Sequence, residues 1–137
     1  MKITARAEYA SLAVLELALR YNGTQVQARE IAEKQQIPLK FLEQIMIQLR
    51  NAGLVRSVRG ALGGYLLARP PDEISLRDVV EAVEGELSIV DGKLEDKTLK
   101  AVWAEIQEEF LNRLASISIQ SLVNRKMQEN RVIDFQI

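Results

Sequence analysis

The chain of 137 residues contains no cysteine and no histidine. These absences exclude disulfide bonds, thiolate and imidazole metal ligands, cysteine nucleophiles and histidine-based acid–base catalysis. Carboxylates are present, but clusters such as Asp91, Glu95 and Asp96 have no neighbouring group in the sequence that would adapt a pKa to catalysis. We therefore expect a protein that is not an enzyme, with no catalytic residues, no metal site and no cofactor.

A long apolar run and a secretory leader are also missing. No stretch approaches the ~18 apolar residues that a membrane span requires. Glu8 interrupts the start of the chain before an apolar signal region can form. We expect a cytoplasmic protein without a membrane partner. Its length suits one domain, or one small domain with an appended helical arm, and folding would bury roughly two-thirds of the unfolded surface.

Charge is distributed unevenly along the chain. Residues 1–71 contain 10 Lys and Arg against 5 Asp and Glu, whereas the remainder contains 8 against 14. A basic first half suits a polyanionic partner, and an acidic second half suits solvent and protein contacts.

Apolar spacing predicts three helices in the first half. In AEYASLAVLELALRY (residues 7–21) apolar residues recur at helical intervals, and Asn22 and Gly23 follow as a stop signal. A second helix is expected over residues 27–35, and a third from Pro38 to about Asn51.

The link between the second and third helices is very short. Gln36 and Ile37 form it, so the spacing favours a helix-turn-helix in which Gln36 makes the turn without glycine. An ordinary pair of packed helices in a bundle is the alternative.

The stretch RSVRGALGGYLLARP (residues 56–70) contains three glycines between two strand-like segments. A phosphate-binding loop is excluded because a strand, not a helix, follows the glycines, and no G-K-[ST] is present. The pattern predicts a β-hairpin with a narrow tip. A plain turn remains an alternative, but it leaves the arginines at 56, 59 and 69 unexplained.

A fourth helix is expected after Ser75, which with Asp78 resembles a capping box, and Gly85 ends it. The predicted order is three helices, a hairpin and a helix. The fold class is therefore mainly α with a small β-hairpin, a winged helix-turn-helix DNA-binding domain over residues 1–85.

Candidate DNA-binding residues lie on the third helix and the hairpin. Gln44 can bond an adenine edge, Lys40 can reach guanine or phosphate, and Phe41 either contacts a thymine methyl or belongs to the core. Arg59 at the narrow tip is the better minor-groove candidate. The full set is Lys40, Phe41, Gln44, Gln48, Arg56, Arg59 and Gly60.

Residues 86–98 are polar and predict a linker, and residues 99–137 predict a dimerisation helix with a C-terminal tail. The helix carries a long apolar stripe that needs a partner, either a second copy or its own chain. The stripe consists of Leu99, Val102, Trp103, Ile106, Phe110, Leu114 and Ile117. In the mixed tail from Asn124, the apolar residues Val132, Ile133, Phe135 and Ile137 could dock locally.

Three segments carry a family resemblance: KITARAEYA, FLEQIMIQLRNAGLVRSVRGALGGYLLARPP and ISLRDVVEAVEG. They resemble the Rrf2 family of bacterial winged-helix transcription regulators, the family of IscR, NsrR and CymR, from Met1 to about Gly85. The resemblance implies a homodimer, more often a repressor, on imperfect palindromic double-stranded DNA. The third helix would enter the major groove and the glycine-rich wing the minor groove.

The resemblance also assigns individual positions. Lys40, Phe41 and Gln44 match base-reading positions, Glu43 matches an acidic position that modulates site choice, and Arg59 matches the wing arginine. A protein-interaction module that does not bind specific DNA remains the alternative function.

Many members of that family hold an iron–sulphur cluster through three cysteines between the fourth helix and the dimerisation helix. The corresponding residues 86–98 contain no cysteine. Glu8 stands at a position that supplies an oxygen ligand in certain relatives, but the chain has no thiolates that could form the rest of such a site. The resemblance is therefore closest to the cysteine-poor branch that includes CymR. Three inputs stay open: a regulatory partner protein, a small-molecule effector, or the concentration of the protein alone.

Overall fold

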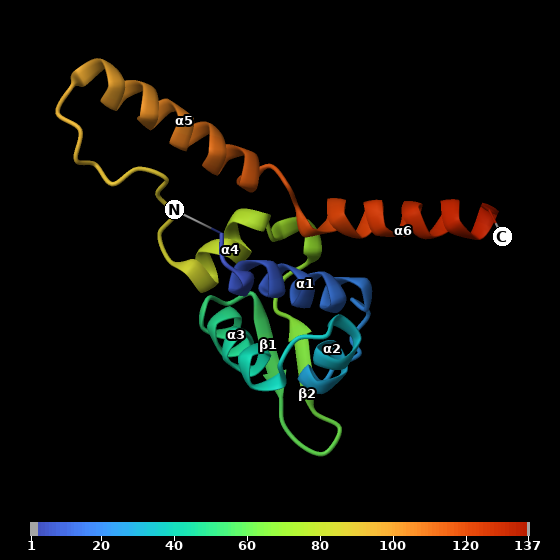
Figure 1. Cartoon of the computed structure of the whole chain (residues 1–137). Coiled ribbons are helices and arrows are strands. Elements are labelled where there is room, and N and C mark those ends of the chain that lie inside the picture. Colours follow the sequence, from blue (N-terminus) through green and yellow to red (C-terminus); the bar gives the residue numbers. More distant parts are fainter. Residues whose placement is uncertain (1–2, 137) are drawn as a thin grey trace.

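Six α-helices, one 3-10 turn and one β-hairpin make up the computed structural model, which describes residues 3–136 and the side chains of residues 3–132. The elements are α1 (Ala5–Leu19), α2 (Ala28–Gln35), α3 (Leu39–Asn51), β1 (Val55–Val58), β2 (Gly64–Leu67), η1 (Pro71–Glu73), α4 (Leu76–Glu84), α5 (Lys97–Ala115) and α6 (Ile119–Gln136). The hairpin tip projects from one end of the molecule, and α5 and α6 extend from the other (Figure 1). The predicted fold class is confirmed. Among the described helices, none is long and apolar enough to cross a membrane.

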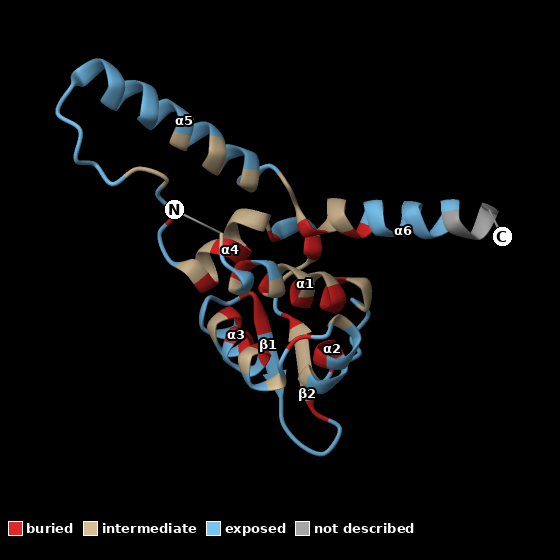
Figure 2. Ribbon diagram, in the orientation of Figure 1, coloured by how far each residue is buried: buried red, intermediate tan, exposed pale blue. Residues whose placement is uncertain are grey.

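The core is centred on α1. Its buried face carries Ala7, Ala10, Ala13, Val14 and Leu17, whose spacing places them on one side of a helix. Because three of them are alanines, the neighbouring helices α3 and α4 can approach the α1 backbone closely. The buried residues gather in the unit formed by α1 to α4 and the hairpin, whereas α5 is mostly exposed (Figure 2). Tyr21, expected on the apolar face, lies beyond the end of α1 and is 48% exposed.

The predicted turn between α2 and α3 is confirmed. Gln36 adopts the left-handed conformation with φ 55° and ψ 45°, which a residue with a Cβ occupies at a cost of about 1 to 2 kcal/mol. The backbone N–H of Ile37 donates to the carbonyl of Ala32 at 2.9 Å, closing the end of α2. Ile31, Ala32 and Ile37 are buried at this corner. The two helices therefore form a fixed helix-turn-helix unit.

The hairpin is antiparallel, with Val55 opposite Leu67 and Val58 opposite Gly64. It is extended by the loop between α1 and α2, because Val26 exchanges backbone hydrogen bonds with Tyr65 at 2.9 and 2.8 Å. The wing base is thus attached to the helix-turn-helix as well as to its own strands.

The capping box of α4 forms as predicted. Ser75 Oγ accepts from the N–H of Asp78 at 3.0 Å, and Asp78 Oδ2 accepts from the N–H of Ser75 at 2.9 Å. Gly85 follows the last residue of α4, as expected.

The prediction of one continuous helix through Ile117 is wrong. Helix α5 ends at Ala115, and the connection to α6 pairs with the segment before α4: Leu76 N donates to Ile117 O, and Ile119 N donates to Ile74 O, both at 2.8 Å. Ile119 is fully buried. The helix breaks here because Ile119 is drawn into the core of the N-terminal unit and the backbone of Ile117 pairs with that of Leu76.

The segment from Asn124 to Gln136, for which the sequence predicted no conformation, is helical and belongs to α6. Val132 is 52% exposed and does not dock on the described surface. The side chains of Ile133 and Phe135, and all of Ile137, lie outside the described residues.

The predicted linker is shorter than expected and is partly anchored. Helix α5 starts at Lys97 because Asp96 Oδ1 accepts from the N–H of Leu99 at 2.9 Å and caps the helix. Leu87 is only 4% exposed.

Candidate DNA interface

Helix α3 has one buried face and one free face. Leu42, Ile45, Met46 and Leu49 are buried at 0% exposure and fix the helix to the core. The opposite side exposes Lys40, Glu43, Gln44 and Ile47. A helix that is held this firmly presents its exposed side chains in a defined register, as base reading requires.

Phe41 is half-buried rather than free. Its ring meets that of Tyr9 edge to face, with centroids 5.7 Å apart and planes at 82°. The guanidinium of Arg6 lies over the same Phe41 ring, 5.8 Å from its centroid. Phe41 therefore holds the first turn of α3 against α1, and this contact limits the ring surface that a base could reach.

Gln48 is also half-buried, and its Oε1 is enclosed without a hydrogen-bond partner among the described residues. One turn earlier, Gln44 is exposed. Of the two amides, Gln44 is thus the one that can reach a groove edge without rearrangement.

The wing tip spans residues 59–63 and is exposed apart from Gly63. Leu62 is 84% exposed, and its carbonyl accepts a hydrogen bond from the Gln25 side chain. A Cβ at Gly63 would lie 2.2 Å from the carbonyl oxygen of Val58, so glycine is required for the narrow turn. Gln25 was not predicted, since a contact 37 residues away has no local signal.

Three of the basic side chains of this region have no acidic neighbour among the described residues. In the part of the chain whose side chains are described, no carboxylate lies within 4.0 Å of Lys40, Arg56 or Arg59. Arg69, in contrast, lies 3.8 Å from Asp78. The three unpaired charges are available to a polyanion, and the predicted Gly60 sits beside Arg59 with φ 112° and open space around it.

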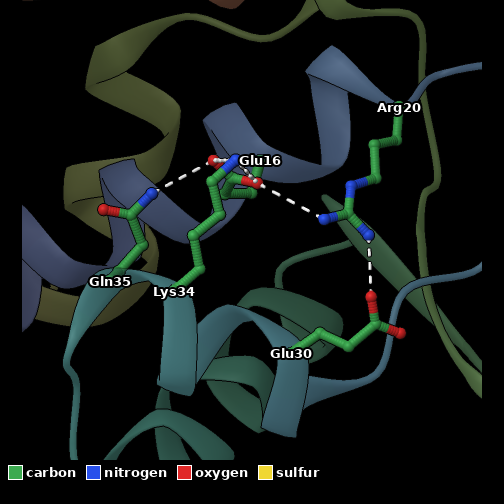
Figure 3. Close-up of polar contacts among 5 residues, drawn as sticks. All are labelled: Glu16, Arg20, Glu30, Lys34 and Gln35. Atoms are coloured by element: carbon green, nitrogen blue, oxygen red, sulfur yellow. Dashed lines mark hydrogen bonds and ion pairs between the residues drawn. The ribbon is translucent and has the colours of Figure 1, made fainter.

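A polar network that sequence reasoning missed fixes α2 against α1 (Figure 3). Glu16 is 4% exposed, and its carboxylate accepts from Lys34 Nζ at 3.0 Å and from Gln35 Nε2 at 3.1 Å. Arg20 lies 4.0 Å from Glu16 and donates to Glu30 at 2.8 Å. The network orients the first helix of the helix-turn-helix. Its only sequence signal is a single glutamate in the apolar stripe of α1.

Helices α2 and α3 with their short turn, the buried inner face of α3 and the projecting hairpin together define a winged helix-turn-helix protein. A profile of the Rrf2 family, described as an iron-dependent transcriptional regulator, matches residues 3–125. The chain belongs to this family of helix-turn-helix transcriptional regulators, which are not enzymes.

Individual members of the family are similar to this chain over most of its length. The transcriptional regulator CymR of Bacillus subtilis is 33% identical over 139 residues, covering 100% of both chains. IscR of Photorhabdus laumondii is 36% identical over 133 residues, covering 92% of this chain and 81% of the relative. The solved structure of B. subtilis CymR, titled the global cysteine regulator of that organism, superposes with a TM-score of 0.81 at 30% identity, over 91% of this chain and 98% of that one.

The iron in the family description does not fit the residues of this chain. Thiolates hold iron–sulphur clusters, and the sequence has neither cysteine nor histidine. Within the described residues, no three Asp or Glu side chains gather in a way that could hold a metal ion. A thiolate-held iron–sulphur cluster therefore cannot form on this chain.

Proposed function

We propose that this regulator acts as a homodimer on pseudo-palindromic DNA, with α3 in the major groove and the glycine-rich wing in the adjacent minor groove. The observation that carries the proposal is the free face of α3, with Lys40 and Gln44 exposed opposite a fully buried face. The hairpin tip with Arg59 projects from the end of the molecule that lies away from α5 and α6 (Figure 1). The described part of the helical arm therefore lies away from the end that would meet a duplex (Figure 1).

The roles divide by chemistry. Gln44 would bond an adenine edge, Lys40 a guanine or a phosphate, and Arg59 the negative potential of a narrow minor groove. Arg56, on the strand, would contact the backbone. Glu43, beside Gln44, would accept from cytosine or repel other sites.

The second copy would pack along the exposed half of the α5 stripe. Leu99, Val102, Trp103 and Ile106 are 40% to 51% exposed, which is unusual for four large apolar side chains on one helix face. The other half is partly covered by the same chain, since Phe110 and Leu114 line an apolar groove against α1 and α4. A two-fold pair through residues 99–106 would cover the exposed part.

We further propose repression as the output, without a cofactor, in the cytoplasm. Occupying an operator blocks other proteins sterically, whereas activation requires an added contact with the polymerase. The input would be a small molecule or a partner protein.

The test is retention of genomic fragments by the full chain, with sequencing of the retained DNA. We expect a short set of fragments that share an inverted repeat, and binding that weakens with salt at a log–log slope near −0.9 per phosphate contacted. The variant Gln44→Ala should lose the selection of fragments while keeping non-specific binding. Retention of no DNA, or of all fragments equally, would instead favour a protein-interaction module.

A further inference from the structure

A separate concave region lies between the segment that follows α4 and helix α5, remote from the α3 face. Its volume is 360 Å³, within the range of small-molecule sites. Ile89, Val90 and Leu94 form one wall, and Lys100, Trp103 and Gln107 of α5 form the other. The cavity thus brings together the two elements that join the DNA-binding unit to the helical arm.

One end of the cavity is already tied together. Gln107 Oε1 accepts from Ser88 Oγ at 2.9 Å and from the N–H of Ile89 at 3.0 Å. Leu87, immediately before, is buried in the core. The segment is therefore fixed to α5 at this end, and the wall that it forms is built before any ligand arrives.

The lining combines an apolar wall with one available cation. Trp103 supplies a flat aromatic face, and Lys100 has no carboxylate within 4.0 Å among the described side chains. Asp91 also lines the cavity, but its Oδ1 accepts from the N–H of Lys93 at 3.0 Å. An ammonium beside aromatic and aliphatic walls suits a ligand with an apolar body and an anionic end.

We propose that this cavity binds a small organic carboxylate with an apolar or aromatic body, whose carboxylate pairs with Lys100 and whose body packs on Trp103. This assignment goes beyond the proposed function and is testable without DNA, so its failure would leave the DNA proposal untouched.

The cavity and the dimer stripe occupy different sides of α5. At 100° per residue, the row of Lys100, Ala104 and Gln107 lies about 130° around the helix from the row of Leu99, Val102 and Ile106. Trp103 stands at the border between the two rows. A ligand can therefore enter the cavity while a second copy covers the stripe.

Trp103 is the sole tryptophan of the chain, so intrinsic fluorescence reports on the cavity directly. The full chain would be titrated, at a concentration where sedimentation shows one species, with three probes that share one body: phenylpropionate, phenylpropionamide and phenylpropylamine. We expect a saturable change with the carboxylate and binding at least about fivefold weaker for the neutral and cationic probes. Lys100→Gln should bring the carboxylate and the amide within about twofold of each other, whereas Lys97→Gln, on the same helix outside the cavity, should bind like the wild type.

The site would be overturned if phenylpropionate gave no saturable change in fluorescence, or if the amide or the amine bound equally well or more tightly. A Lys100→Gln variant that still prefers the carboxylate over the amide would also overturn it. If the fluorescence of Trp103 changed with protein concentration but with none of the three probes, a second copy would fill the cavity. That result also contradicts the proposal.

Discussion

The ammonium Nζ of Lys34 lies 3.0 Å from Oε1 of Glu16, a carboxylate whose side chain is only 5% exposed. Because Gln35 donates to the same carboxylate, Lys34 and Gln35 together tie the last turn of α2 to the last turn of α1. Lys34 itself is 54% exposed, so water screens its share of the attraction. The network thus depends more on the buried acceptor than on the exposed cation.

Replacing Glu16 by Ala should lower the free energy of unfolding by about 1 to 3 kcal/mol, because Gln35 loses its buried acceptor and a void is left. Lys34→Met should cost less, about 0 to 1 kcal/mol. Urea denaturation of both single variants and the double variant measures the coupling between them. Equal losses in the two single variants would show that the cation, rather than the buried acceptor, dominates.

Glu30 is expected to titrate below its ordinary range. The hydrogen bond from Arg20 is the main cause that lowers the pKa of Glu30. Since the folded-state pKa is depressed, the stabilisation is present above the unfolded-state pKa and is lost as pH falls through the folded-state pKa. NMR titration of the Glu30 carboxyl carbon should show the lowered pKa, and Arg20→Gln should raise it towards the value in the urea-unfolded chain. An unchanged pKa in that variant would contradict the assignment.

Arg59→Ala should weaken operator binding by about 1 to 3 kcal/mol and relax the preference for an A·T-rich, narrow minor groove. Arg56→Ala, on strand β1 of the same hairpin, is the matched control. It should weaken binding to all sequences alike and reduce the salt slope by about one contact. Anisotropy titrations on operators with A·T-rich and G·C-rich flanks separate the two effects. Identical behaviour of both variants would remove the minor-groove role of Arg59.

Gly64→Ala should destabilise the wing base. A Cβ at Gly64 would lie 2.6 Å from the carbonyl oxygen of Val26, and this clash would break the backbone bridge between Val26 and Tyr65. We expect a loss of about 1 to 3 kcal/mol in urea unfolding. Gly60→Ala is the control, because it too has positive φ but open space around its Cβ position. If both variants lose the same stability, backbone strain and not the clash is responsible.

Val102→Glu combined with Ile106→Glu should dissociate the proposed dimer, since both side chains are exposed, at 42% and 40%, and line neither apolar cavity of α5. Sedimentation should give a mass near the 15.5 kDa of one chain, with the helical circular dichroism retained. Ala101→Glu, on the opposite side of α5, should leave the mass unchanged. A double variant that keeps twice the monomer mass would show that residues 99–106 are not the interface.

Local signals were sufficient for much of the fold. The capping box of α4 involves residues three apart, and the turn at Gln36 follows from the shortness of the link between two helices. The exposure of Gln44 likewise follows from helical spacing once the buried face of α3 is recognised. Each of these features is determined within a few residues of itself.

Features that depend on distant partners could not be predicted. The break after α5 arises because Ile117 and Ile119 pair with Leu76 and Ile74 across more than forty positions of the chain. The apolar stripe continues through the break, so periodicity alone gives no sign of it. The clamp of Gln25 on the wing tip and the position of Phe41 against Tyr9 likewise depend on which surfaces meet.

Helix α5 (Lys97–Ala115) is held at its middle, where Gln107 accepts hydrogen bonds from the segment after α4, and at its C-terminal end, where Ile117 and Ile119 pair with the segment before α4. The first half of α5, residues 97–106, therefore extends beyond both contacts. A second copy that packs on residues 99–106 would act on this extended half of the helix. Both contacts lie next to α4, the helix that packs against α1 and α3. A displacement of α5 would therefore reach α4 first.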